Sequence, residues 1–357
     1  MVPNHYDMIV FCHLRWQFVF QRPQHLISRL SKTYKVLLVE EPIGFGDGQE
    51  FTAELLEVNP QLHILQPRVH RIDDIAQVLS HYVSNELVPI AWFYSASFSS
   101  ILASRKFGTI VYDCMDELSL FKRAPQYLIN QEKFLLKNAD IVFTGGKSLF
   151  ESKRELHDNV FCFPSSVDEK HFAQALNGVA IPGDIINIPS PIIGYFGVID
   201  ERINLDLIRQ SAERLPQVSF VMIGPLAKIE DQDLPRLPNI YYLGMKSYQE
   251  LPAYLKAFDI AMMPFALNDA TKYISPTKTL EYMAAGKPII STRIKDVERD
   301  YDRCVRIVDD TNEFCEAILE LNSTGFNGVK KYTEILANTS WDATALKMGN
   351  ILNEAKK

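Results

Sequence analysis

The sequence predicts an α/β protein of two doubly wound domains, whose parallel sheets face each other across a cleft. The chain has 357 residues, about twice the length of an ordinary domain. Hydrophobic residues make up 47% and charged residues 23%, which is the composition of a globular protein with a sizeable core. Short β-branched and aromatic runs alternate with helical patterns along the whole chain. This alternation is typical of parallel sheets that are covered on both faces.

The first half of the chain contains several apolar runs with the composition of buried strands. The predicted strands are Asp7–Cys12, Lys35–Glu40, Leu62–Gln66, Ile90–Tyr94, Thr109–Cys114, Ile141–Thr144 and Val160–Pro164. The helical patterns between them cover Pro23–Ser31, Asp74–Glu86, Pro125–Asn138 and Lys147–Leu156. These elements define a first domain over residues 1–180.

Residues 174–191 interrupt the alternation. They contain Asn177-Gly178 and Pro182-Gly183 without periodicity, so we interpret them as the interdomain linker and as a hinge. Strands then resume at Ile192–Ile199, Val218–Ile223, Ile240–Leu243, Ile260–Pro264, Pro288–Thr292 and Val305–Val308. Helices are predicted at Leu205–Leu215, Gln249–Ala257, Pro276–Ala285, Glu313–Leu321, Val329–Leu336 and Asp342–Ala355. A second domain therefore spans residues 190–340, and ligands of such domains bind at the carboxyl ends of the strands.

Charge and cysteine content narrow the function classes. The net charge is −7 and both halves are mildly acidic, which excludes a basic face for nucleic acid. The five cysteines include no Cys-x-x-Cys pair and the histidines are scattered, so we expect reduced thiols and no metal site. The first residues lack a signal-peptide pattern, and no apolar run is long enough to span a bilayer. These features favour the cytoplasm and leave peripheral contact with the inner face of a membrane open.

Two familiar nucleotide-binding motifs are incomplete in this chain. Gly146-Lys147-Ser148 follows a strand as in a P-loop, but the position that needs glycine is Ile141. No Gly-x-Gly-x-x-Gly follows a first strand, so a dehydrogenase is also disfavoured.

The most informative segment is SPTKTLEYMAAGKPII, residues 275–290. Ser275 is a good N-cap, Pro276 suits the first helical position, and Gly286 marks the helix end. Lys278 then lies in the first turn, where the helix dipole disfavours a cation. A phosphate bound at this helix end would reverse that argument, because the free N–H groups and the lysine would converge on one anion.

Glu281 lies three residues after Lys278 among apolar neighbours. A carboxylate in such surroundings needs a partner. One interpretation is a simple i, i+3 salt bridge to Lys278. The other is that Glu281 accepts two hydroxyls of a ligand whose phosphates are held by Lys278, with Lys272 and Tyr273 adding to the same pocket.

A polar and aromatic loop, HLRWQFVFQRPQHL at residues 13–26, follows the first predicted strand. Its side chains suit sugar stacking and hydroxyl recognition, and loops at this edge of a sheet are where sites are built. The candidate acceptor or sugar contacts are His13, Arg15, Trp16 and Arg22. The alternative is that Trp16, Phe18 and Phe20 pack the loop down while the arginines are solvated.

The segment at 275–290 resembles the nucleotide-sugar signature of GT-B glycosyltransferases of the retaining, glycogen-synthase-like superfamily, often called glycosyltransferase family 4. That signature reads E-x7-E, followed by a small-residue helix, Gly-x-Pro and a strand. Its second glutamate falls on Glu281 and its first on Tyr273, so the motif is degenerate. Other segments agree in order over nearly the whole chain, namely 138–151, 161–172, 192–208, 220–225, 239–244, 259–265 and 340–345.

The resemblance implies a fold and a set of site residues. The fold is two Rossmann-like domains, with residues 341–357 forming a helix that crosses back onto the first. The implied donor-nucleotide residues are Gly224, Tyr273, Pro276, Thr277, Lys278 and Glu281, with Glu281 holding the ribose. Arg202, Lys278 and Asp116 are the implied catalytic residues, although Met115-Asp116 stands where relatives often have His-Asp. Enzymes of this fold generally hold the diphosphate without a metal.

The function that follows is transfer of a sugar from a nucleotide-diphosphate sugar to a glycan or lipid-linked acceptor in surface polysaccharide biosynthesis, with retention. We expect the nucleotide sugar as donor substrate and no further cofactor. Two alternatives stay open. One is a nucleotide-sugar 2-epimerase of the same fold, and the other is a catalytically silent sugar- or nucleotide-binding partner of a glycosyltransferase. The donor base, the donor sugar and the acceptor are not encoded in any motif that we identify.

Overall fold

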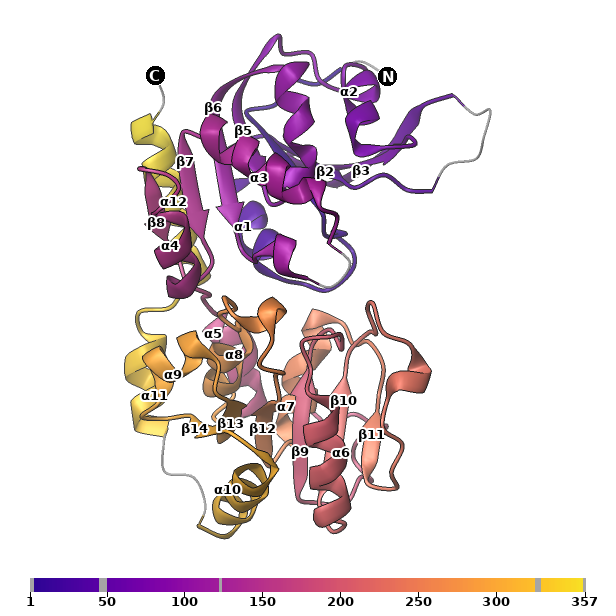
Figure 1. Ribbon diagram of the computed structural model, residues 1–357, viewed down its shortest axis with the longest axis vertical. Helices are drawn as coiled ribbons and strands as arrows, with labels where there is room; N and C mark the ends of the chain where they lie inside the picture. The colour runs from indigo at the N-terminus through magenta and orange to yellow at the C-terminus, as the bar shows by residue number, and fades with distance from the viewer. Residues whose placement is uncertain (1–2, 45–49, 122–123, 325–328, 356–357) are drawn as a thin grey trace. The chain divides into compact units, whose positions relative to one another are not determined.

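The computed structural model describes residues 3–44, 50–121, 124–324 and 329–355. By its internal contacts the chain divides into two compact units. Unit 1 comprises Met1–Pro164 together with Trp341–Lys357, and unit 2 comprises Ser165–Ser340. Each unit consists of one sheet with helices packed beside it (Figure 1). The predicted α/β class is confirmed, and each unit is described by itself below.

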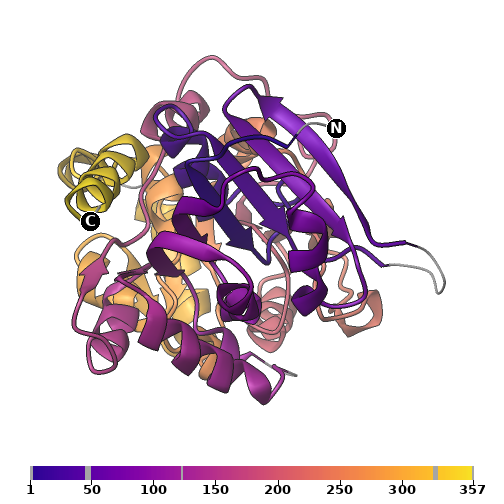
Figure 2. The ribbon, with the colours of Figure 1, turned by 90° about the horizontal axis from the view of Figure 1, so that it is seen from above.

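Unit 1 is built on an eight-stranded sheet in the order β3-β4-β2-β1-β5-β6-β7-β8. Its strands are β1 Met8–Cys12, β2 Val36–Glu40, β3 Thr52–Asn59, β4 Leu62–Arg68, β5 Leu87–Phe93, β6 Lys106–Cys114, β7 Ile141–Thr144 and β8 Val160–Cys162. All neighbours are parallel except β3 and β4, which form an antiparallel hairpin at one edge (Figure 2). The fully buried strands β1 and β2 are continuous apolar runs, as expected for a sheet covered on both faces.

The helices of unit 1 are close to those predicted, with one exception. They are α1 Arg22–Leu30, α2 Ile75–Leu79, α3 Tyr127–Asn138, α4 Lys147–Lys153 and α12 Trp341–Ala355. The helix predicted at residues 74–86 is only the short α2, preceded by a 3-10 turn. The C-terminal α12 packs on α1: the Trp341 ring stacks on His25 at 4.7 Å, and Arg29 Nε donates to Asp342 at 3.0 Å.

Unit 2 has a six-stranded, wholly parallel sheet in the order β11-β10-β9-β12-β13-β14. Its strands are β9 Ile192–Phe196, β10 Ser219–Ile223, β11 Ile240–Tyr242, β12 Ile260–Met263, β13 Ile289–Thr292 and β14 Arg306–Val308. Its helices are α5 Glu169–Phe172, α6 Leu205–Arg214, α7 Leu251–Ala257, α8 Lys278–Ala284, α9 Lys295–Tyr301, α10 Thr311–Thr324 and α11 Val329–Leu336. This strand order is that of the doubly wound nucleotide-binding fold.

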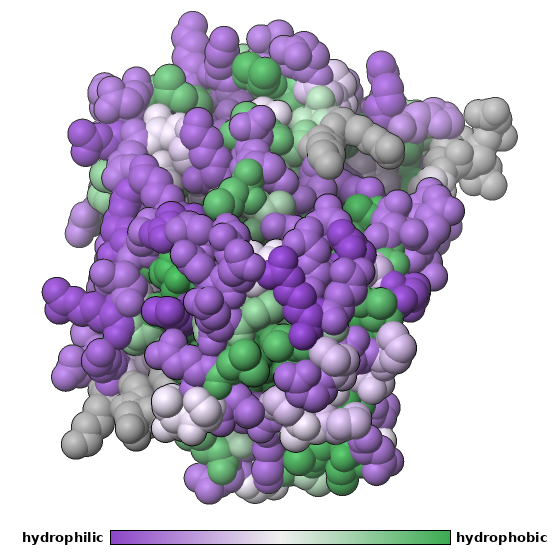
Figure 3. Space-filling view, turned by 60° about the horizontal axis from the view of Figure 1, so that its bottom comes forward, coloured by the Kyte–Doolittle hydropathy of each residue, from purple (hydrophilic) through white to green (hydrophobic). Residues whose placement is uncertain are grey.

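Each unit has its own apolar core, formed by the inward faces of its sheet and helices. The face drawn in Figure 3 is mostly hydrophilic, with hydrophobic side chains in small groups between polar ones. None of the helices in the described part of the chain is long and apolar enough to cross a membrane.

The segment predicted as a linker, residues 174–191, is part of unit 2 in the structure. Ile185 is fully buried, and the carboxylate of Asp184 accepts hydrogen bonds from Lys246 Nζ at 2.7 Å and Tyr254 Oη at 2.8 Å. The chain instead passes between units at Pro164/Ser165 and at Ser340/Trp341. Glycine and proline therefore mark tight turns here, and the prediction that this segment is a hinge is wrong.

We expect Asp184→Ala to loosen this segment. The substitution removes both side-chain bonds, but the carboxylate is 40% exposed, so the loss in stability of unit 2 should be only about 1 kcal/mol. Limited proteolysis should then cut the variant faster within residues 174–191, whereas the wild type resists. Equal cleavage rates would contradict the anchoring role of Asp184.

Candidate functional site

The carboxyl ends of the central strands of unit 2 are the place where this fold binds ligands, because the strand order reverses between β9 and β12. Gly197 follows β9 with φ +136°, and Gly224 follows β10 with φ +148°. A Cβ atom on Gly224 would lie 1.9 Å from the carbonyl oxygen of Gly197. Both positions favour glycine, because their φ values are unfavourable for other residues. At Gly224 a side chain would also meet the backbone of Gly197, and at Gly197 it would meet the side chains of Lys278 and Tyr195.

Lys278 lies directly against Gly197, the first of these two glycines. Its Cε and Nζ atoms are 2.3 Å and 2.6 Å from the point where a Cβ of Gly197 would be. Its Nζ also lies 5.6 Å from the ring centroid of Tyr195, which is a cation–π contact. Gly224 and Lys278, two of the residues that the sequence implied for the donor nucleotide, thus both lie against Gly197.

The helix that carries Lys278 begins later than predicted. We expected it to start at Pro276 with Ser275 as N-cap, but α8 starts at Lys278. The reason is that the preceding residues are engaged elsewhere: Ser165 Oγ donates to the Ser275 carbonyl at 2.9 Å, and Thr277 Oγ1 donates to Ser165 Oγ at 3.0 Å. Lys278 is therefore the first helical residue rather than the third.

Glu281 is a buried carboxylate of α8. It is only 7% exposed, and within the described residues no hydrogen bond or ion pair engages its carboxylate. The i, i+3 salt bridge to Lys278 that the sequence allowed is not formed there. Burial raises the pKa of Glu281 to about 7, and the nearby charge of Lys278 opposes this shift.

For Arg202 and Tyr273, which the resemblance also implied for the donor side, the structure shows contacts with other residues of unit 2. Arg202 forms a bidentate pair with Asp200, with Nε at 3.0 Å from Oδ1 and Nη2 at 2.8 Å from Oδ2. Much of its charge is therefore met within unit 2 already. Tyr273 is half-buried, and Lys272 Nζ lies 5.3 Å from its ring centroid.

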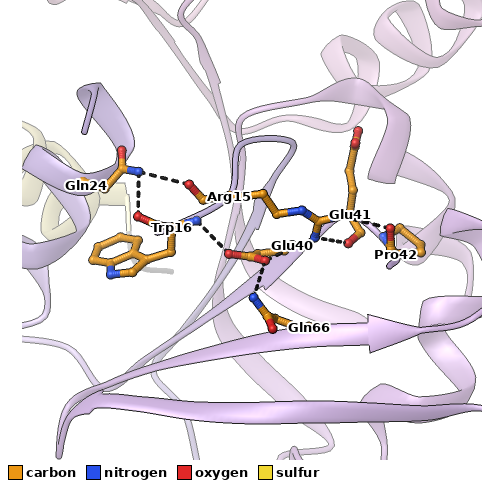
Figure 4. Close-up of polar contacts among 7 residues, drawn as sticks. All are labelled: Arg15, Trp16, Gln24, Glu40, Glu41, Pro42 and Gln66. Carbon is orange, nitrogen blue, oxygen red and sulfur yellow. Dashed lines mark hydrogen bonds and ion pairs between the residues drawn. The ribbon is translucent and has the colours of Figure 1, made fainter. Parts of the chain in front are cut away.

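In unit 1 the loop after β1 is held by a carboxylate that sequence reasoning missed (Figure 4). Glu40, at the end of β2, is fully buried. Its two oxygens accept from the Trp16 amide at 2.7 Å, from Arg15 Nη1 at 3.2 Å and from Gln66 Nε2 at 3.0 Å. Gln24 Nε2 also donates to the Trp16 carbonyl at 3.1 Å. The sequence feature that could have indicated this role of Glu40 is an acidic residue at the end of an apolar strand.

Arg22 is buried rather than presented at the surface. It is 5% exposed, its Nε and Nη2 bind Asp113 at 3.1 Å and 2.9 Å, and its Nη1 donates to the Phe163 carbonyl at 2.8 Å. Arg15 is likewise bonded to Glu40 and to backbone carbonyls. The alternative that the arginines are simply solvated is therefore wrong, whereas sugar contacts of His13, Arg15, Trp16 and Arg22 stay predictions.

Asp116 follows β6 and is half-buried. Next to it Glu117 binds Lys153, whose Nζ is 2.7 Å from both Glu117 Oε2 and Glu132 Oε1. Burial raises the pKa of Glu117. Lys153 is almost fully buried. The pattern of apolar residues in the helix predicted at 147–156 did not indicate that this lysine would be buried. This cluster fixes the segment that carries Asp116 onto α3 and α4.

No metal site is evident in the described ranges, where no group of three or more His, Cys, Asp or Glu residues is arranged to hold an ion. All five cysteines are free thiols.

The fold defines a class: an α/β protein of two units, each built on a mainly parallel sheet, with two glycines at the strand ends after β9 and β10 of unit 2. Residues 190–324 match the family of group 1 glycosyl transferases. This part of the chain is thus a group 1 glycosyltransferase domain.

A curated relative and several solved structures agree with this class. TuaH of Bacillus subtilis (strain 168), named as a teichuronic acid biosynthesis glycosyltransferase, is 22% identical over 258 residues, which cover 64% of this chain and 62% of TuaH. The match thus spans less than two thirds of TuaH. Sucrose-phosphate synthase of Thermosynechococcus elongatus has a TM-score of 0.71 at 14% identity, covering 99% of both chains. HepE of Anabaena, solved with UDP and glucose, has a TM-score of 0.66 at 12% identity, covering 98% of this chain and 100% of HepE.

Proposed function

We propose that this protein is a glycosyltransferase that moves a sugar from a nucleotide-diphosphate sugar to a glycan or lipid-linked acceptor in surface polysaccharide biosynthesis, with retention. The observation that carries the proposal is Glu281, a buried carboxylate for which the described part of the chain supplies no hydrogen-bond donor. It is close to Lys278, which lies against Gly197, within residues 190–324 that match group 1 glycosyl transferases. The surface polysaccharide role is supported by the relative TuaH.

The chemistry required of this site is modest. When the bond between sugar and diphosphate breaks, negative charge develops on the leaving phosphate, and a cation fixed beforehand at that place lowers the barrier. Lys278 would supply this charge, and the proposal involves no metal or other cofactor. Glu281 would accept the two ribose hydroxyls, which are donors that a buried carboxylate lacks in the free protein.

The acceptor side is proposed for unit 1. Trp16 is on a loop that Glu40 and Gln24 hold rigidly, and aromatic rings on a rigid support suit stacking on a sugar. His13, Arg15 and Arg22 belong to the same loop and its helix, and Asp116 lies on a segment fixed through Lys153. We place the reaction in the cytoplasm, because the cysteines are free thiols.

Titration with UDP, GDP and ADP, followed by melting temperature, tests the donor site. A bound nucleotide should raise the melting temperature in proportion to the logarithm of its concentration over Kd, and one base should dominate. Turnover of the matching radiolabelled sugar nucleotide then distinguishes an enzyme from a silent binding partner, which Tyr273 at the first glutamate position would also fit. If no nucleotide shifts the melting temperature, the donor site as described is refuted.

A further inference from the structure

Ser165 is the first residue of unit 2 and touches the donor segment directly. Its hydroxyl donates to the Ser275 carbonyl at 2.9 Å and accepts from Thr277 Oγ1 at 3.0 Å. Those two residues flank Pro276, immediately before Lys278 at the start of α8. The Ser165 hydroxyl therefore forms hydrogen bonds with the Ser275 carbonyl and the Thr277 hydroxyl. Because α8 begins only at Lys278, these two groups would otherwise bond to solvent.

The segment that begins at Ser165 is hydrogen-bonded to the residues just before Trp341, where the chain crosses between the units a second time. Val167 N donates to the Thr339 carbonyl at 3.1 Å, and Val167 forms a parallel bridge with Ser340. The outgoing and returning chain segments thus lie side by side within unit 2, joined by this bridge. Only one residue separates Ser165 from Val167, so a displacement of these two segments would move the Ser165 hydroxyl relative to Ser275 and Thr277.

We propose that Ser165 is a positioning residue for the donor site, which couples the paired crossing segments to the segment that carries Lys278. This inference rests on the proposed function, because it assigns Lys278 and Glu281 to donor binding. When the two Ser165 bonds are intact, residues 275–277 hold the first turn of α8 against Gly197. When they are lost, Lys278 keeps its charge but not its fixed place, and binding of a nucleoside diphosphate weakens.

Ser165→Ala tests the role, and Ser219→Ala is a matched control. Ser219 Oγ also donates to a carbonyl, that of Pro189 at 2.6 Å, but it lies at the amino end of β10, opposite to the donor site. We expect Ser165→Ala to raise the Kd of the nucleoside diphosphate about fivefold to tenfold. Ser165→Thr should restore the affinity, because it keeps the hydroxyl. Ser219→Ala should lower the melting temperature without changing Kd.

Hydrogen exchange of the wild-type protein tests the coupling without a variant. Binding of the nucleoside diphosphate should slow exchange of the Val167 amide, which is bonded to Thr339, and leave the Ser219 amide, bonded to Pro191, unchanged. An unchanged Kd in Ser165→Ala, together with unaltered exchange at Val167, would overturn the inference. If Glu281→Gln still weakens binding at least about tenfold in that case, the proposed function survives alone; if the wild type binds no nucleotide, both fail.

Discussion

Glu281→Gln is expected to make the protein more stable at pH 8 and, at the same time, to remove most of its affinity for a nucleoside diphosphate. The buried carboxylate has a pKa of about 7 in the folded protein against an ordinary value of 4.5. Folding therefore favours its protonated form, and the ionised form costs stability. That cost is absent below pH 4.5, grows between pH 4.5 and 7, and reaches about 3 kcal/mol above pH 7.

Glutamine keeps the shape of the protonated side chain and carries no charge at any pH. The variant should therefore melt several degrees above the wild type at pH 8, and the difference should vanish below pH 4.5. Its affinity for the nucleotide should fall about tenfold to a hundredfold, because bonds to a charged acceptor are lost. Melting curves across pH and the nucleotide Kd measure the two effects.

Glu334→Gln is the control for this experiment, since Glu334 is exposed in the same unit and should change neither quantity. A Glu281→Gln protein that is destabilised at pH 8 would show that the carboxylate has a partner stronger than solvent. Unchanged nucleotide affinity would exclude Glu281 from the donor site.

Lys278→Met should lower kcat for cleavage of the sugar nucleotide by about a hundredfold to a thousandfold, the usual effect of removing one fixed group that meets developing charge. Lys278→Arg should not restore the rate. The Cε atom lies only 2.3 Å from the point where Gly197 would carry a Cβ, so the larger guanidinium should not fit in the same position. Steady-state rates with the labelled donor identified by the nucleotide titration give the measurement.

Lys170→Met provides the comparison, because Lys170 is an exposed lysine of α5 in the same unit and should leave kcat unchanged. A rate for Lys278→Met within threefold of the wild type would mean that another cation meets the leaving group. Arg202 would be the next residue to vary, despite its pairing with Asp200.

The fold could be predicted well because most strands of both sheets are apolar runs that need no tertiary information to be recognised. The strand Ile141–Thr144 and the helix Val329–Leu336 have the predicted bounds. The strand β3 was missed because its residues are mostly exposed or half-exposed and rich in glutamate. Only its antiparallel pairing with β4 makes it a strand. Glycine and proline in residues 174–191 led to the wrong prediction of an interdomain linker. The buried Ile185 shows the reason, because turn residues indicate where the chain bends but not whether the bend is exposed to solvent.

The candidate site could be proposed from the sequence at positions where the residue type conflicts with local preference. Lys278 at a helix start and Glu281 among apolar residues are both unfavourable choices unless a ligand is present, and the structure places them beside the strand ends. The contacts between distant segments were not predictable. Ser165 and Ser275 are 110 residues apart, and Glu40 and Trp16 are 24 apart. Serine and glutamate have no spacing signature that announces such partners.

The return of α12 to unit 1 has a consequence for synthesis. Unit 2 is complete in the chain at Ser340, whereas unit 1 still lacks Trp341, whose indole is fully buried against His25. During translation the later-encoded unit can therefore finish folding first, and the one that contains the N-terminus must wait with part of its apolar interior uncovered. In effect the second unit is an insertion within the first. A chain truncated before Trp341 would contain all residues of unit 2 but would leave part of the apolar core of unit 1 exposed.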